Sequence, residues 1–112
     1  MRPVVQQARR VCPVEVAVAV LGGSWKLSIV NALLEHGTLR TSALRRELTG
    51  VSERTLTRQL RELEIDGILA RTVHPEVPPR VEYSVTELGL TLEDIVEAMN
   101  TWGRRIEERL ES

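Results

Sequence analysis

The stretch Ser52–Ser84, which reads SERTLTRQLRELEIDGILARTVHPEVPPRVEYS, decides the fold. Three leucines in its first half recur at spacings of four and three, which places them on one face of a helix: Leu56, Leu60 and Leu63. Three arginines fall about the opposite face: Arg54, Arg58 and Arg61. Gly67 ends this helix, and a predicted hairpin follows it. A helix that is apolar behind and cationic in front, joined to a hairpin, indicates a protein that reads DNA.

The hairpin is predicted from two runs rich in Val, Thr and Tyr, at Leu69–His74 and Arg80–Ser84. The loop between them carries three prolines, which stiffen it. We therefore expect a wing over about 69–84.

Upstream of this stretch the sequence predicts short helices with little loop between them. Val14–Leu21 is an apolar helix that stops at two glycines. We expect a second helix over Trp25–His36, with Ser24 as its N-terminal cap. Gly37 occupies the usual C-terminal glycine position of that helix, and Thr38–Arg40 is a candidate for a very short strand.

A third helix, capped by Thr41 or Ser42, is predicted to end near Leu48. After it comes a compact turn over 49–51, and Ser52 then caps the arginine-bearing helix. In a helix-turn-helix one helix braces the next as it enters the major groove, which is the succession predicted over about 41–66.

Downstream, Thr86 is expected to open one long final helix. Large apolar residues keep helical spacing along it: Leu88, Leu92, Ile95, Met99, Trp102, Ile106 and Leu110. The core of one small domain does not easily cover so long a stripe, so we predict a dimer interface. Its expected residues are Ile95, Met99, Trp102 and Ile106.

Bulk composition is that of an ordinary globular domain of 112 residues, with 42% hydrophobic and 28% charged residues. A single cysteine excludes an intrachain disulfide. No apolar run reaches bilayer-spanning length and no signal-peptide core is present, so we expect one cytoplasmic domain over 1–112 without a membrane partner.

The distribution of charge is more informative than the formal net charge of -1. Between residues 40 and 61 six arginines face two glutamates, a net charge of +4, whereas residues 86–112 carry three arginines and seven acids, a net charge of -4. This asymmetry lets one face attract phosphate while another stays solvated. Lys26 is the only lysine, and the planar fork of arginine suits phosphate and guanine.

Enzymatic chemistry has little support in the sequence. His36 and His74 lack cysteine or histidine partners at metal-ligand spacings. No glycine-rich phosphate cradle or nucleophile elbow occurs. We therefore expect no catalytic residues, no metal and no cofactor.

Several separated motifs carry a family resemblance. They are Cys12–Glu15, Gly22–Lys26, Ser52–Leu63, Asp66–Gly67, Pro75–Gly89 and Trp102. In this order they resemble the HxlR family of bacterial winged-helix transcription regulators, over roughly residues 12–102.

The resemblance implies a homodimer that binds a pseudo-palindromic operator in double-stranded DNA. It assigns the recognition helix to Ser52–Asp66, the wing to Pro75–Arg80, and dimerisation to about 1–12 and 86–110. The fold class expected is thus mainly α with a small β-hairpin (α+β): a winged helix-turn-helix that dimerises through its terminal helices.

Candidate DNA contacts follow from the recognition helix and the wing. They are Arg54, Thr57, Arg58 and Arg61, with Ser52 and Thr55 as backbone contacts and Arg80 at the wing. Arg80 has two readings, as an exposed charge at a strand end or as a contact to phosphate or the minor groove. Arg45 and Arg46 on the bracing helix are further backbone candidates. Glu53 and Glu76 are acidic near these surfaces, where they select a cytosine amino group or point away.

Cys12 is a candidate redox-sensing residue. A buried cysteine commonly serves as a small hydrophobe, but a thiol at a helix N-terminus forms its reactive thiolate more readily. Some members of the resembled family sense oxidants or electrophiles through the matching cysteine, and others have no such role. A small-molecule effector is a second regulatory candidate, for which the sequence offers no aromatic cage.

These observations favour a sequence-specific transcriptional regulator, more readily a repressor than an activator. The alternative is a winged-helix module that mediates protein contacts without specific DNA binding. The arginine stripe of the recognition helix argues against that alternative but does not exclude it.

Overall fold

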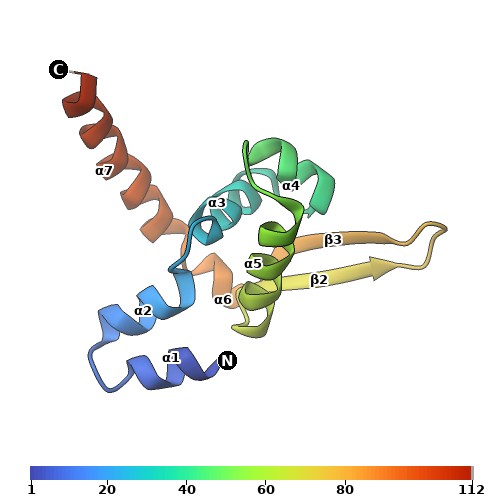
Figure 1. Ribbon diagram of the computed structural model, residues 1–112, viewed down its shortest axis with the longest axis horizontal. Helices are drawn as coiled ribbons and strands as arrows, with labels where there is room; N and C mark the ends of the chain where they lie inside the picture. Colours follow the sequence, from blue (N-terminus) through green and yellow to red (C-terminus); the bar gives the residue numbers. More distant parts are fainter. Residues whose placement is uncertain (112) are drawn as a thin grey trace.

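The protein, described over residues 1–111 by a computed structural model, is built from helices around a small three-stranded sheet (Figure 1). In chain order the elements are α1 (Pro3–Ala8), α2 (Pro13–Leu21), α3 (Lys26–His36), β1 (Leu39–Arg40), α4 (Thr41–Glu47), α5 (Glu53–Ile65), β2 (Leu69–His74), β3 (Arg80–Val85), α6 (Glu87–Leu90) and α7 (Glu93–Glu111). This is the winged helix-turn-helix that the sequence predicts, with α4 and α5 as the helix pair and β2–β3 as the wing.

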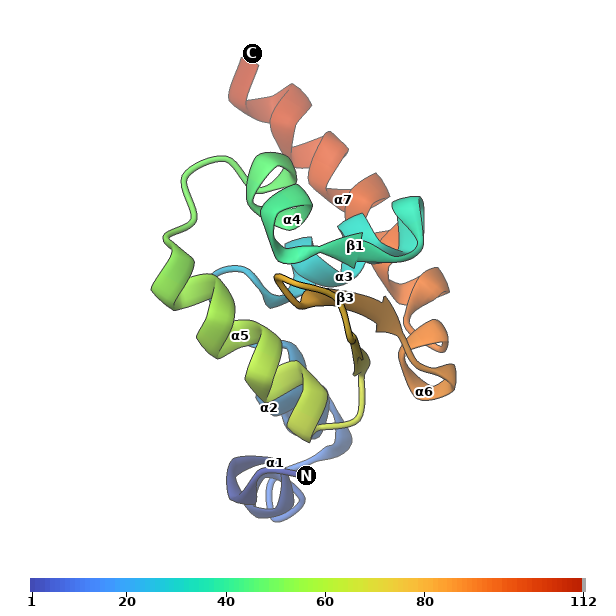
Figure 2. The same ribbon diagram turned by 90° about the vertical axis from the view of Figure 1, so that its right-hand side faces the viewer.

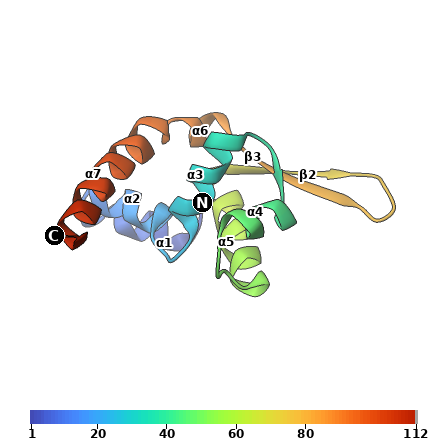
Figure 3. The ribbon, with the colours of Figure 1, turned by 90° about the horizontal axis from the view of Figure 1, so that it is seen from above.

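The sheet has the order β1-β3-β2 and is antiparallel throughout. The short strand β1 pairs with β3 through Leu39 and Tyr83, and the β2–β3 ladder runs out to the His74–Arg80 pair. The paired strands β2 and β3 project away from the helices as an extended arm (Figures 1 and 3).

The core forms where α5 packs on α3 and on the base of the hairpin. Leu56, Leu60 and Leu63, the predicted inner face of α5, are 0%, 1% and 0% exposed. Burial of each such side chain is worth roughly 1.5–3 kcal/mol, so these three contacts fix the helix in place. The opposite face of α5 is left on the outside of the molecule (Figure 2).

Both ends of α5 are as predicted. The hydroxyl of Ser52 accepts a hydrogen bond from the Thr55 amide at 3.1 Å. Gly67 has a φ of +81°, a left-handed conformation that glycine adopts without strain, and it ends the helix.

Two predicted caps are wrong. The N-cap of α3 is Trp25, so Ser24 does not cap it and the helix begins at Lys26. Trp25 is half-buried against the core and takes non-helical backbone angles (φ -130°, ψ -6°), so the helix starts one residue later than expected. The N-cap of α4 is Arg40, because β1 runs straight into the helix and leaves Thr41 and Ser42 inside its first turn.

The predicted single final helix from Thr86 is also wrong, because the chain forms two helices there. Thr86 caps the short α6 by accepting a hydrogen bond from the Gly89 amide at 3.0 Å. Its hydroxyl also lies 2.6 Å from the Gly67 carbonyl oxygen, to which it donates. A side chain at Gly89 would collide with the Ile68 carbonyl and the Val85 side chain, so α6 packs closely against the base of the hairpin. The amides of Thr91 and Leu92 then bond to the carbonyls three residues back, which makes a turn, and α7 starts at Glu93.

The segment before Pro13 contains a further helix, α1, which was not predicted as such. It packs against α2. Together with α7, this helix pair occupies the end of the molecule opposite the hairpin tip (Figures 1 and 3).

Candidate nucleic-acid interface

The outward face of α5 presents the predicted DNA-contacting side chains. Ser52, Arg54, Thr57, Arg58 and Arg61 are exposed, and Thr55 is half-buried. Within residues 1–111 none of these three guanidinium groups forms an ion pair, so their charges face solvent. The face is therefore a row of cations on a rigid, well-packed helix.

The bracing helix α4 adds two exposed arginines beside this face. Arg45 Nη1 lies 3.9 Å from Glu53 Oε2, a loose contact between exposed groups across the turn. Arg46 is exposed with no ion pair among the residues described. The carboxylate of Glu53 thus lies beside the guanidinium group of Arg45 on α4.

The wing holds its arginine differently. Arg80 Nε lies 3.2 Å from Glu76 Oε2 and 3.0 Å from Glu82 Oε1, and its side chain is 33% exposed. His74 Nε2 lies 2.7 Å from the same Glu82 oxygen. Arg80 is thus not a free surface charge: its Nε lies within ion-pair distance of two carboxylates, although the described residues give this nitrogen no hydrogen bond.

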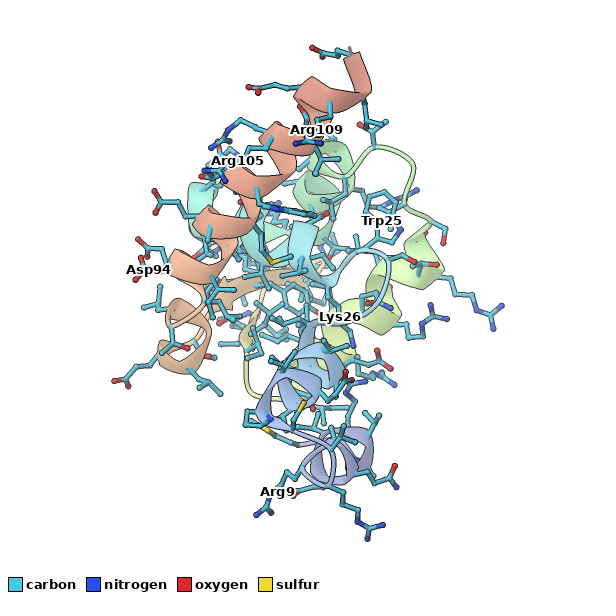
Figure 4. The ribbon with its side chains drawn as sticks, turned by 90° about the vertical axis from the view of Figure 1, so that its left-hand side faces the viewer. Arg9, Trp25, Lys26, Asp94, Arg105 and Arg109 are labelled. Carbon is cyan, nitrogen blue, oxygen red and sulfur yellow. The ribbon has the colours of Figure 1, made fainter. Side chains whose placement is uncertain are left out.

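The back of α5 carries a buried ion cluster that the sequence reasoning missed. Asp66, at the C-cap of α5, is 0% exposed and Lys26 is 2% exposed. Arg2 Nη2 lies 2.6 Å from Asp66 Oδ2, and Lys26 Nζ lies 2.8 Å from Glu62 Oε1. Lys26 lies where α3 begins, beside α2 and α5 (Figure 4). Two features of the sequence could have pointed to this cluster. Lys26 is the only lysine, and Asp66 directly precedes Gly67, and each lies in a motif of the family resemblance to which no role was assigned.

The charges of the cluster are mutually stabilised. The hydrogen bond from Lys26 lowers the pKa of the Glu62 carboxyl against the opposing effect of its burial, with help from the charges of Lys26, Arg2 and Arg58. Burial alone raises the pKa of Asp66, but the hydrogen bonds from the side chain and backbone of Arg2 outweigh it, so the net pKa is below the ordinary value. Both acids are therefore held ionised.

Apolar side chains are exposed at the end opposite the wing. The predicted interface residues on α7 are open to solvent: Ile95 50%, Met99 48%, Trp102 64% and Ile106 36%. Four valines of the α1–α2 pair are likewise exposed: Val4, Val11, Val14 and Val18. Three of these valines (Val4, Val11 and Val18) line a groove of about 390 Å³.

Cys12 lies at the N-cap of α2, between the two N-terminal helices, with a half-buried, free thiol. This is the helix-start position expected from the sequence. It is remote in sequence from α5 but belongs to the helix pair that flanks the valine groove.

Two other kinds of site find no support in the part of the chain that the structure describes. No group of three or more His, Cys, Asp or Glu side chains could hold a metal ion there. No single helix among residues 1–111 is long and apolar enough to cross a membrane, although α2 and α3 together pass by length and composition across a 77° bend.

Comparison with known proteins agrees with this geometry. The model of the HxlR-like helix-turn-helix family matches residues 20–111. A relative from Methanothermobacter thermautotrophicus, named an uncharacterized HTH-type transcriptional regulator, is 50% identical over 93 residues, which span 83% of this chain and 70% of the relative.

Two solved structures of the redox regulator HypR are similar in fold and sequence. Its reduced form superposes with a TM-score of 0.83 and 46% identity, over 89% of this chain and 98% of that one. Its oxidized form gives a TM-score of 0.79 and 48% identity, over 84% and 96%.

A winged helix with a cationic recognition face defines the class as a DNA-binding transcription regulator. The chain belongs to the HxlR-like helix-turn-helix family, as its resemblance predicted.

Proposed function

We propose that the protein is a homodimeric repressor that binds a pseudo-palindromic operator through α5. The observation that carries this proposal is the row of unpaired arginines at 54, 58 and 61 on the exposed face of a helix whose other face is fully buried. Arginine forks on such a helix suit phosphate and guanine in the major groove. Ser52, Thr55 and Thr57 are the proposed polar contacts beside them.

The exposed apolar faces support the dimer. Ile95, Met99, Trp102 and Ile106 are too large and too exposed to be explained by the fold of one protomer. A stable interface buries about 800 Å² per partner, which two helical faces are able to supply. We propose that α7 and the α1–α2 pair of one protomer cover those of its partner.

A two-fold dimer presents two recognition helices to one face of DNA. Their half-sites are then expected about 34–36 Å apart, or a multiple of this distance. Bound to a promoter in the cytoplasm, such a dimer represses by occupying the DNA.

Regulation through Cys12 is the finer part of the proposal. Two similar structures are those of a redox regulator, and Cys12 lies at the start of α2 in the proposed dimerising region. We propose that an oxidant or electrophile that modifies this thiol changes DNA binding. A Cys12→Ser protein should then bind DNA equally well before and after oxidant treatment; continued loss of binding on treatment would exclude this role.

The experiment that tests the whole proposal is a fluorescence-anisotropy titration at several salt concentrations. One duplex carries the DNA upstream of the protein's own gene, and the control duplex carries the same bases scrambled. Tight binding to the upstream DNA alone, weakening steeply with salt, is expected for a dimer whose arginines displace counterions.

The same titration addresses the alternative of a protein-interaction module. No binding to either duplex even at low salt would contradict the proposal in favour of that alternative. Equal, weak binding to both would show that this DNA is not the operator, and a selection from random duplexes would then be the decisive search.

A further inference from the structure

The buried ion cluster joins segments that are far apart in the chain. Arg2 stands before α1, Lys26 begins α3, and Glu62 and Asp66 lie at the C-terminal end of α5. The views in Figures 1 and 2 agree that the N-terminus lies beside this end of α5. The cluster is therefore a contact between the N-terminal segment and the recognition helix.

Arg2 donates hydrogen bonds to Asp66 from both its backbone and its side chain. Its amide N–H donates to Asp66 Oδ1 at 2.8 Å, and its Nε donates to Oδ2 at 2.8 Å. Its Nη2 also donates to the Ala19 carbonyl of α2 at 2.8 Å, and Nη1 lies 3.5 Å from Glu62. One residue thus ties the last turns of α2 and α5 together.

This contact is directional as well as strong. A guanidinium offers its donors in a fixed plane, so several simultaneous bonds specify the position of the carboxylate. The carboxylate of Asp66 is fully buried and the side chain of Arg2 is only 16% exposed, so water does not readily replace either partner. Displacement of α1 and α2 therefore moves this end of α5 or breaks buried charge pairs.

We propose that Arg2 is a positioning residue for DNA binding, which sets the placement of the recognition helix relative to the α1–α2 pair. The inference rests on the proposed function, because α1 and α2 belong to the proposed dimer surface. In a dimer, a contact that fixes α5 against this surface also fixes the spacing and tilt of the two recognition helices. The cluster is then the link between subunit assembly and operator fit.

The positioning role of Arg2 can be distinguished from a contribution to the stability of the fold. Near its N-terminal end α5 is held by the Ser52 cap and by Leu56, neither of which touches the cluster. Loss of Arg2 is therefore expected to loosen the far end of a helix that stays folded. Binding that depends only on phosphate charge should survive, and binding that depends on two correctly placed helices should not.

The test compares Arg2→Ala with Arg71→Ala in the full-length chain. Arg71 is the control, since it is an exposed arginine of β2 with no ion pair within residues 1–111, and it lies outside the recognition helix, the wing loop and the proposed dimer surface. Affinity is measured by anisotropy for the operator and for a scrambled duplex. We expect Arg2→Ala to weaken operator binding about tenfold and scrambled-duplex binding by less than about twofold. Arg71→Ala should bind the two duplexes with the wild-type ratio of affinities.

A second measurement, hydrogen exchange of the free protein, does not require DNA. Hydrogen exchange of the amides at Asp66 and Gly67, which close the end of α5, should be faster in Arg2→Ala than in wild type or Arg71→Ala. Arg2→Lys keeps the charge and the backbone bond but loses the fork, so it should fall between wild type and Arg2→Ala. A thermal melt of each variant confirms that it is folded.

The outcomes separate the two proposals. If Arg2→Ala and Arg71→Ala exchange alike, the positioning role is overturned whether or not the protein binds DNA. Faster exchange with an unchanged ratio of operator to scrambled affinity also overturns it, because the cluster then only stabilises the fold. If the wild-type protein binds no DNA at all, the proposed function fails, and the exchange data still decide whether Arg2 holds the end of α5.

Discussion

The recognition helix and the wing both carry arginine where DNA is expected, but they hold it in different ways. On α5, Arg54, Arg58 and Arg61 are exposed and make no ion pair within the described chain. On the wing, Arg80 lies against Glu76 and Glu82, and His74 shares Glu82. The same residue type is therefore available for phosphate in one region and already paired in the other.

This difference shows that the number of arginines in a region does not by itself tell how many of them are free to bind phosphate. When an arginine that is paired with two carboxylates binds phosphate, the loss of those ion pairs offsets part of the binding free energy. An arginine without an ion pair loses mainly its hydration. Five expected outcomes, taken from the largest effect to the smallest, test how each region of the molecule holds its charges.

Arg58→Ala should have the largest effect on operator binding. Removal of an unpaired guanidinium from the middle of α5 is expected to cost about 1–3 kcal/mol of binding free energy, and the salt slope should fall by about one if Arg58 contacts phosphate. Anisotropy titrations at several salt concentrations measure both quantities. Arg71→Ala, which removes the same charge from β2, serves as the control; equal behaviour of the two variants would remove Arg58 from the interface.

Asp66→Asn should reveal how firmly the back of α5 is held. Loss of one charge from the buried pair with Arg2 is expected to lower the free energy of unfolding by about 2–3 kcal/mol at about pH 7. Denaturant unfolding followed by circular dichroism measures this. Glu64→Gln, an exposed neighbour on the same helix, should change stability little.

The pH dependence of stability follows from the same cluster. The folded-state pKa values of Asp66 and Glu62 lie below their ordinary values of 3.8 and 4.5. On acidification the unfolded chain therefore binds protons first, so the stabilisation is complete above the ordinary values and is lost as pH falls through the lowered ones. Asp66→Asn should show a shallower acid decline than wild type, and an identical decline would contradict the assignment.

Local features of the fold could be predicted because their causes are local. The Ser52 cap, the end of α5 at Gly67 and the strands of the wing depend on residues within a few positions of one another. The leucine face of α5 was likewise visible as a period in the sequence.

Long-range features could not be predicted in this way. Arg2 and Asp66 are 64 positions apart, and no local pattern pairs them. Gly89 lies so close to the Ile68 carbonyl that a side chain would collide with it, a tertiary contact that the continuous apolar period of residues 88–110 does not show. The pairing of Arg80 is a similar case, since the sequence shows its charge but not which acid lies beside it.

Ser52→Ala should weaken the N-terminal end of α5, the end that the buried ion cluster does not hold. Loss of the bond to the Thr55 amide is expected to lower the free energy of unfolding by about 1 kcal/mol. Ser42→Ala is the matched control, because Ser42 is exposed in the first turn of α4 and caps nothing there. Equal destabilisation by the two substitutions in denaturant titrations would mean that the cap adds no stability.

Arg80→Ala should have the smallest effect, and it tests the contrast directly. Because its charge is already balanced by Glu76 and Glu82, its loss is expected to weaken operator binding by less than about threefold. Glu82→Gln should strengthen binding about twofold by releasing Arg80, and the gain should vanish in the double variant that also carries Arg80→Ala. Glu87→Gln removes an exposed acid away from the wing and controls for the change in net charge. A loss at Arg80 as large as that at Arg58 would show that DNA opens the wing's ion pairs, and the two regions would then bind as equals.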